Sequence, residues 1–199
     1  MLRADAQDNR DRVLEAARSL FAERGIDIPM REIARHAGVG PATLYRRFPT
    51  KQILIDQAFA EELAACRGIV VDGCADPDPW RGFCTVVERI SLLNGRNHGF
   101  VEAFLAAAPT AETFAEHRIA LLGMLAGLAS RAQAAGGLRP DFVIDDLVLV
   151  LLTGRALATR PPAARADAAR RFAALAIDAF RASDDHRPLP QRVRLPASL

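Results

Sequence analysis

Lysine is almost absent from this chain: of its 26 basic residues, Lys51 is the single lysine and the other 25 are arginines. Long hydrophobic runs are also missing, since the longest, Ile119 to Ala129, has eleven residues. A run of that length is too short to span a bilayer. The first twelve residues, MLRADAQDNRDR, contain no apolar signal-peptide core. We therefore expect a cytoplasmic protein without a membrane partner.

Metal, redox and catalytic signatures are scarce as well. The three cysteines, Cys66, Cys74 and Cys84, are an odd number without a CxxC spacing, which indicates reduced, partly buried thiols. The four histidines show no metal-ligand spacing, and we find no nucleophile–base pair, paired acids or cofactor loop. We therefore expect no metal, no cofactor and no enzymatic activity.

The net charge of +2 hides an uneven distribution. Residues 1–51 hold ten basic and seven acidic side chains, a balance of +3, whereas residues 52–199 hold sixteen basic and seventeen acidic ones, a balance of −1. The basic excess therefore lies at the N-terminal end, where a nucleic acid is a plausible partner.

The pattern of residues predicts an all-α fold of about nine helices. Runs of β-branched and aromatic residues with period two are lacking, and Ala, Leu, Arg and Glu dominate. The predicted helices span about 9–24, 30–37, 41–48, 51–71, 79–93, a short segment ending near 108, 111–135, 144–158 and 162–182. The proline-rich residues 183–199 are predicted to form a disordered tail.

Two short helices joined by a glycine turn, at about residues 30–48, are typical of a helix-turn-helix DNA-binding unit. Gly38 permits the turn, while Leu44 and Phe48 would anchor the second short helix to the first helix of the chain, at about residues 9–24. The other side of that helix would then face the major groove. The residues that we expect to contact DNA are Arg31, Gly40, Pro41, Ala42, Thr43, Tyr45, Arg46, Arg47 and Lys51.

These residues offer different contacts. Arg46 or Arg47 can bond guanine or a phosphate, Thr43 a thymine methyl or a phosphate, and the Tyr45 hydroxyl a phosphate. Lys51 adds its charge to the positive end of the next helix, for which Thr50 is a good N-cap. Arg31 is either a phosphate contact or part of a solvated face.

The stretch REIARHAGVGPATLYRRFPTKQIL, residues 31–54, resembles the signature of TetR-type (tetracycline-repressor-like) transcriptional regulators. The matching positions are Ile33, Ala34, Ala37, Gly38, Val39, Leu44, Tyr45, Phe48, Lys51 and Leu54. Pro29 and Gly40 depart from it, because they stand where hydroxyl side chains are frequent. The resemblance implies a DNA-binding domain over residues 1–51 and a helical effector-binding and dimerisation domain over residues 52–182.

Two further sets of residues follow from that division. The last two helices are apolar on most sides, which favours a dimer interface over an internal core; its expected members are Leu147, Leu151, Leu152, Phe172, Leu175 and Phe180. The expected lining of an effector pocket is Trp80, Phe83, His98, Phe100, Phe104, Phe114, His117 and Met124, with Glu102 and Arg118 as further polar groups. Each aromatic residue among them is also a reasonable core residue.

The sequence thus predicts a homodimeric repressor that binds palindromic half-sites on double-stranded DNA and is released by a small apolar or aromatic effector. An activator, or a regulator without a ligand, is the first alternative. A helical enzyme and a protein-interaction module are more remote alternatives.

Overall fold

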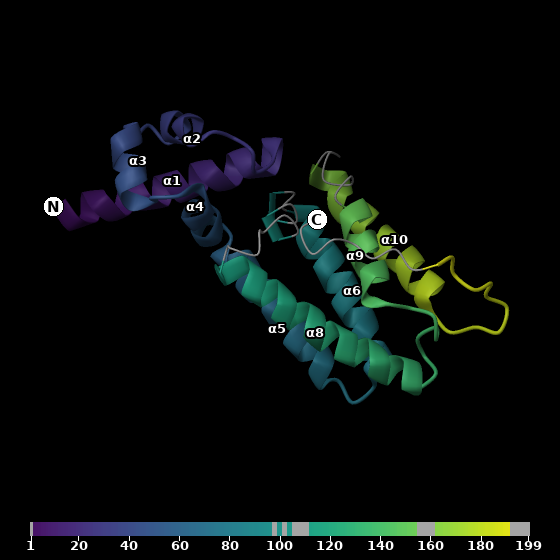
Figure 1. Ribbon diagram of the computed structural model, residues 1–199. Helices are drawn as coiled ribbons and strands as arrows, with labels where there is room; N and C mark the ends of the chain where they lie inside the picture. The colour runs from purple at the N-terminus through teal and green to yellow at the C-terminus, as the bar shows by residue number, and fades with distance from the viewer. Residues whose placement is uncertain (1, 97–98, 101–102, 105–111, 155–161, 192–199) are drawn as a thin grey trace.

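The computed structural model describes residues 2–96, 99–100, 103–104, 112–154 and 162–191. These residues form nine helices, and their one β pairing is an isolated bridge between Leu138 and Arg181. The predicted all-α fold is therefore confirmed. Figure 1 shows the N-terminal helices gathered at one end of the molecule and the helices of the body running away from them.

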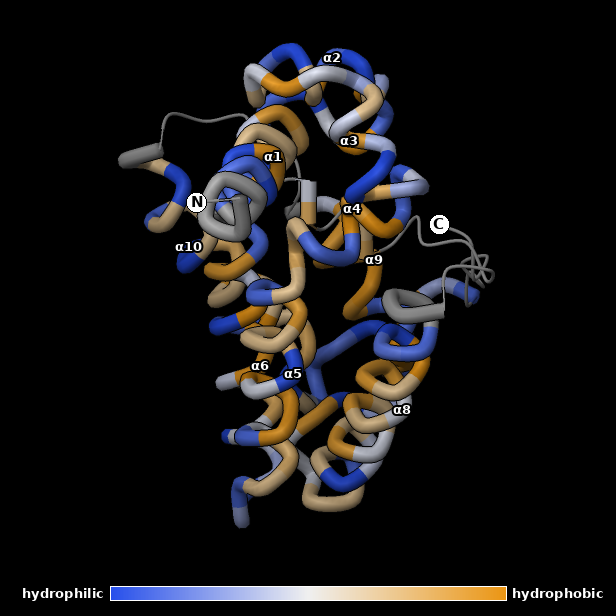
Figure 2. Tube along the Cα trace, turned by 90° about the vertical axis from the view of Figure 1, so that its left-hand side faces the viewer, coloured by the Kyte–Doolittle hydropathy of each residue, from blue (hydrophilic) through white to orange (hydrophobic). Residues whose placement is uncertain are grey.

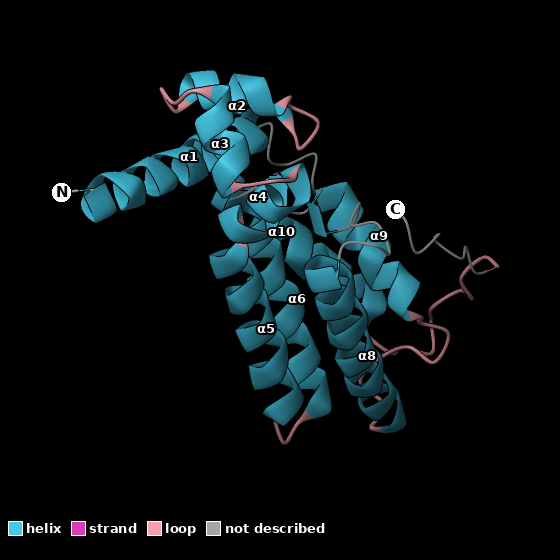
Figure 3. Ribbon diagram, turned by 60° about the vertical axis from the view of Figure 1, so that its left-hand side comes forward, coloured by secondary structure: helices cyan, strands magenta, loops and turns pink. Residues whose placement is uncertain are grey.

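The N-terminal end consists of α1 (Leu2–Arg24), α2 (Met30–His36), α3 (Pro41–Arg47) and α4 (Lys51–Ala58). The inner face of α1 has helical spacing and is buried; it consists of Val13, Leu14, Ala17, Leu20 and Phe21. Because α1 begins at Leu2 rather than near Asn9, its first turns project beyond α3, as Figures 1 and 3 show.

The predicted single helix from Lys51 to about Val71 is wrong, because the structure interrupts it at Phe59. The Arg18 Nε donates to the Ala58 carbonyl oxygen at 2.9 Å and so occupies an acceptor at the end of α4. The Phe59 ring is fully buried, with its centroid 5.8 Å from that of Phe21. The packing of the Phe59 ring and the hydrogen bond from Arg18 thus separate α4 from α5 (Ala60–Ala75).

The gap between the helices predicted at residues 51–71 and 79–93 is shorter in the structure, because α5 continues to Ala75 and α6 spans Pro79–Arg96. Gly73 and Gly82 allow this close crossing: a Cβ on Gly82 would lie 2.3 Å from the Gly73 carbonyl oxygen. Asp78 caps the start of α6, since its Oδ1 accepts from the Trp80 and Arg81 amides at 3.0 and 3.1 Å.

The body is completed by α8 (Glu112–Ala134), α9 (Ile144–Gly154) and α10 (Pro162–Phe180). α6 packs against α5, α8, α9 and α10. Figure 2 shows hydrophobic residues along α6 and α8, whereas α2 is largely hydrophilic. Within the described residues, no helix is both long and apolar enough to cross a membrane.

Residues 183–191, the described part of the predicted disordered tail, are attached to this body. The buried Arg139 donates from Nη2 to the Arg187 carbonyl oxygen at 2.9 Å, and Asp141 Oδ2 accepts from the Leu189 amide at 2.8 Å. Arg139 also hydrogen-bonds Asp141, which together with the Leu189 amide lowers the pKa of that carboxyl to about 2. Composition alone did not predict these hydrogen bonds.

Candidate DNA-binding site and ligand cavity

The turn between α2 and α3 depends on Gly38, whose φ of +65° favours glycine. Its amide donates to the Arg35 carbonyl oxygen at 3.2 Å, and the Val39 amide donates to that of Ala34 at 3.0 Å. These two bonds form a Schellman motif that ends α2. From α1, Arg12 Nη2 donates to the Ala37 carbonyl oxygen at 2.7 Å and braces the turn.

The start and inner face of α3 follow from its sequence. Gly40 is the N-cap, without a side-chain hydrogen bond, and Pro41 is at the first helical position. Leu44 and Phe48 are buried at 1% and 0% exposure, so the predicted inner face of this helix is confirmed. Tyr45, between them, is 49% exposed.

Most of the side chains predicted to contact DNA lie on the outside of this unit. Arg31, Gly40, Pro41, Ala42, Tyr45, Arg46 and Arg47 are exposed, and Thr43 and Lys51 are half-buried. Arg31, Arg46 and Arg47 make no ion pair with any residue that the structure describes. Three guanidinium groups on this surface are thus available to an anionic partner.

The negative charge of Glu32 is balanced by two neighbouring arginines. Glu32 on α2 accepts from Arg24 at 2.5 Å and lies 3.6 Å from Arg35, and the hydrogen bond from Arg24 lowers its pKa. At the start of α4, the predicted N-cap is confirmed, because Thr50 Oγ1 accepts from the Ile53 amide at 3.2 Å. Because Glu32 is paired with arginines and Thr50 is uncharged, neither residue adds unbalanced negative charge beside α3.

The sequence interpretation missed the part of α1 that flanks α3. A crevice between these helices, of about 500 Å³ including its open mouth, is lined by Asn9, Arg10, Val13, Thr43, Leu44, Arg46, Arg47 and Phe48. Arg10 also donates to Gln57 Oε1 on α4 at 3.0 Å. The polar character of this face was readable from the sequence, but its position beside α3 depends on tertiary packing.

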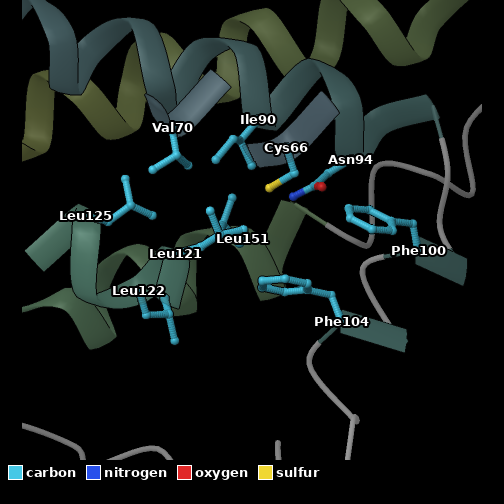
Figure 4. Close-up of a pocket in the computed structure, with 10 residues that line it drawn as sticks. All are labelled: Cys66, Val70, Ile90, Asn94, Phe100, Phe104, Leu121, Leu122, Leu125 and Leu151. Atoms are coloured by element: carbon cyan, nitrogen blue, oxygen red, sulfur yellow. The ribbon is translucent and has the colours of Figure 1, made fainter. Parts of the chain in front are cut away.

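A narrow cavity in the body has an empty volume of about 450 Å³ including its opening (Figure 4). Its described lining comes from helices α5, α6, α8 and α9 and from Phe100 and Phe104. It consists of Cys66, Val70, Ile90, Asn94, Phe100, Phe104, Leu121, Leu122, Leu125 and Leu151. The lining is almost entirely apolar, as is typical of small-molecule sites.

Of the residues that we expected in an effector pocket, Phe100 and Phe104 line this cavity. Trp80 and Phe83 instead stack on each other, with ring centroids 5.9 Å apart, beside Phe142 and Phe180. His117 is half-buried and Met124 is 36% exposed, and neither lines the cavity. His98, Glu102 and the Phe114 side chain lie outside the described residues. The missed lining consists mainly of aliphatic residues, which look like core in a sequence.

Of the residues expected at a dimer interface, some are buried within the protomer and others are exposed. Leu147 and Phe180 are buried within the protomer, while Leu152 and Phe172 are half-buried, and Leu151 is half-buried at the cavity. Leu175 on α10 is 60% exposed. On the neighbouring elements, Leu149 and Ile119 are also exposed hydrophobic side chains.

A row of phenylalanines connects the cavity with the N-terminal domain. The ring centroids of Phe104 and Phe100 are 5.9 Å apart, those of Phe100 and Phe59 5.9 Å, and those of Phe59 and Phe21 5.8 Å. Gly99 lies against α1 so closely that a Cβ there would be 2.6 Å from the Phe21 carbonyl oxygen. The wall of the cavity is therefore in direct contact with the core of the DNA-binding unit.

A braced glycine turn followed by a short helix with a buried inner face and a basic outer face defines a helix-turn-helix DNA-binding protein. The comparisons with known proteins agree. The family model "Bacterial regulatory proteins, tetR family" matches residues 13–58, and the model "Transcriptional regulator SbtR-like, C-terminal domain" matches residues 78–182. The chain therefore belongs to the TetR family of bacterial transcriptional regulators.

Solved structures extend the likeness over most of the chain. The TetR transcriptional regulator SCO0520 from Streptomyces coelicolor is 30% identical, with a TM-score of 0.52, over 87% of this chain and 99% of that one. The ketosteroid transcriptional regulator KstR2 of Mycobacterium tuberculosis shares the fold, with a TM-score of 0.67 at 21% identity, over 87% and 95% of the two chains.

Curated relatives match this chain over a short stretch. An HTH-type transcriptional regulator of Staphylococcus aureus (strain USA300) is 46% identical over 54 residues, which are 27% of this chain. The match spans 29% of the length of that relative.

Proposed function

We propose that the protein is a homodimeric repressor that binds palindromic operator DNA through α3 and is released when a small molecule occupies the cavity. Its chemistry is binding, without a catalytic step. The observation that carries this proposal is the contact between the cavity wall and the DNA-binding core through Phe100, Phe59 and Phe21.

Binding to DNA is supported by Arg31, Arg46 and Arg47, which form no ion pair among the described residues and lie on the same unit as the exposed Tyr45. Guanidinium groups bond phosphates and the guanine edge in the major groove. Because each phosphate contact releases counterions from the DNA, affinity falls steeply as the salt concentration rises.

The homodimer is supported by exposed hydrophobic side chains on α9 and α10. Leu149 and Leu175 are 40% and 60% exposed. Burial of these side chains between two protomers would remove apolar surface from water and so stabilise a twofold dimer. A twofold dimer also presents two α3 helices to two half-sites.

Release follows from linkage between the two sites. A ligand that prefers one arrangement of Phe104 and Phe100 also biases Phe59, which lies at the junction of α4 and α5. A shift of this junction moves α1, on which α3 is braced, and changes the separation of the two α3 helices in the dimer. The coupling then weakens DNA binding and ligand binding reciprocally.

Selection of bound DNA from a random pool tests the first half of this proposal. We expect recovered sequences with two inverted half-sites whose centres are about one helical turn, or a multiple of it, apart. Recovery of unrelated sequences, or of single half-sites, would overturn sequence-specific binding by a dimer. Loss of the protein should raise transcription from a promoter that carries the recovered site, and a fall would instead identify an activator.

A further inference from the structure

The described lining of the cavity includes one side-chain amide group, that of Asn94. Asn94 on α6 is 8% exposed, and Figure 4 shows its side-chain amide directed into the cavity. No residue that the structure describes forms a hydrogen bond with this amide. Eight of the other nine described lining residues are hydrocarbon side chains, and the ninth is Cys66.

An amide in this position has a defined chemical requirement. Asparagine carries both a donor and an acceptor, and leaving them unsatisfied in an apolar site lowers stability. A hydroxyl or a carbonyl on a bound molecule would satisfy one of these groups. The Cys66 thiol contributes little, because a thiol is a weak hydrogen-bonding group and burial raises its pKa to about 11, which keeps it neutral at pH 7.

Charge is absent from the described lining. None of its ten residues is acidic or basic. The nearby Arg118 on α8 donates from Nη1 to the Phe104 carbonyl oxygen at 3.5 Å and does not line the cavity. A carboxylate or an ammonium ion would lose its hydration there without gaining a partner among these residues.

We infer that the cavity takes a neutral, largely apolar molecule whose hydroxyl or carbonyl group hydrogen-bonds the Asn94 amide. This inference rests on the proposed function of the cavity as the effector site, and it adds the chemical class of the effector and the residue that selects it.

Three probes of similar shape test the inference: propylbenzene, 4-propylphenol and 4-propylbenzoate. Their dissociation constants are measured by calorimetric titration of the full chain at pH 7. We expect 4-propylphenol to bind about fivefold more tightly than propylbenzene, which is what one hydrogen bond contributes. Since a hydroxyl group favours water over an apolar site, a preference for the phenol requires a partner in the cavity. The benzoate should not bind measurably.

Asn94→Leu is the variant that isolates the amide, because leucine has the same branching at Cγ and removes the buried polar group. It should bind propylbenzene as well as the wild-type protein does and lose the preference for 4-propylphenol. The matched control is Leu125→Ala, which shortens another lining side chain and should weaken both neutral probes while preserving their ratio.

Several outcomes would overturn the inference. They are equal affinities of the two neutral probes for the wild-type protein, a preference that persists in Asn94→Leu, tight binding of the benzoate, and no binding of either neutral probe. The first of these needs no variant, and it would mean that water already satisfies Asn94.

Failure of the inference and failure of the proposed function give different results. If 4-propylphenol binds with the expected Asn94 dependence but leaves operator affinity unchanged, the ligand class stands and effector release fails. If a compound releases the operator with equal potency from wild-type and Asn94→Leu protein, release stands and the role of Asn94 fails.

Discussion

At the scale of single residues, α3 divides its side chains between stability and DNA contact. Leu44 is 1% exposed and Tyr45, the next residue, is 49% exposed. Substitutions at these two neighbours should therefore change different properties of the protein.

Tyr45→Phe removes one exposed hydroxyl and no packing. We expect the dissociation constant for the operator to rise about two- to tenfold, which is the loss of one hydrogen bond, with an unchanged melting temperature. Fluorescence anisotropy with labelled operator and thermal unfolding measure the two quantities. Unchanged affinity would place the Tyr45 hydroxyl away from the DNA.

Leu44→Ala truncates a side chain that is buried between α3 and the rest of the domain. It should lower the free energy of unfolding by about 2–5 kcal/mol, measured by urea denaturation. Tyr45→Phe is the control on the same helix. Stability equal to that of the wild-type protein would show that the inner and outer faces of α3 are reversed.

At the scale of elements, the turn between α2 and α3 sets how α3 is presented. Two glycines lie in this turn. Gly38 has a positive φ, which favours glycine, whereas Gly40 has a negative φ that other residues also adopt. The two glycines also differ in the room available for a side chain. A Cβ on Gly38 would lie 2.7 Å from Arg12 Nη2, whereas a Cβ on Gly40 would have its nearest neighbour at 3.9 Å.

Gly38→Ala should therefore destabilise the domain by about 1–3 kcal/mol, and Gly40→Ala should leave its stability nearly unchanged. Chemical denaturation of the two variants side by side measures the difference. Equal stabilities would contradict the assignment of the turn to Gly38.

The elements also show how far sequence interpretation reaches. The pattern of Val13, Leu14, Ala17, Leu20 and Phe21 correctly predicts the buried face of α1, because helical periodicity is a local property. The break at Phe59 was not predictable in this way, because it depends on Arg18 and Phe21 from another helix. The close crossing of Gly73 and Gly82 is likewise a tertiary contact.

The lining of the cavity was likewise predictable from the sequence only in part. Phe100 and Phe104 were identified as candidate lining because aromatic residues stand out in a sequence. Leu121, Leu122 and Leu125 were not, because a leucine beside a cavity and a leucine in a filled core have the same sequence pattern. Asn94 was missed because the predicted helix at residues 79–93 stops just before it, whereas α6 continues to Arg96.

At the scale of the whole molecule, Gly99 is the point where the ligand-binding body meets α1. A Cβ there would lie 2.6 Å from the Phe21 carbonyl oxygen and 2.7 Å from its carbonyl carbon, so backbone must shift to accept it. Gly123 on α8 has open space instead, with no atom within 4 Å of an added Cβ.

Gly99→Ala should therefore displace α1 from the body and lower operator affinity about tenfold or more, since a misplaced α3 loses several phosphate contacts at once. The helical circular dichroism spectrum should remain that of a folded protein. Gly123→Ala is the matched control and should bind operator normally. Equal affinities of the two variants would mean that this junction does not set the position of the DNA-binding domain.

The central claim is that the cavity and the DNA-binding surface are coupled. It is tested most directly by measuring the operator dissociation constant of the wild-type protein at increasing 4-propylphenol, and the affinity for 4-propylphenol with and without operator. We predict that operator affinity falls to a plateau and that operator lowers the affinity for 4-propylphenol by the same factor. Operator affinity that is unchanged at saturating 4-propylphenol would contradict the account.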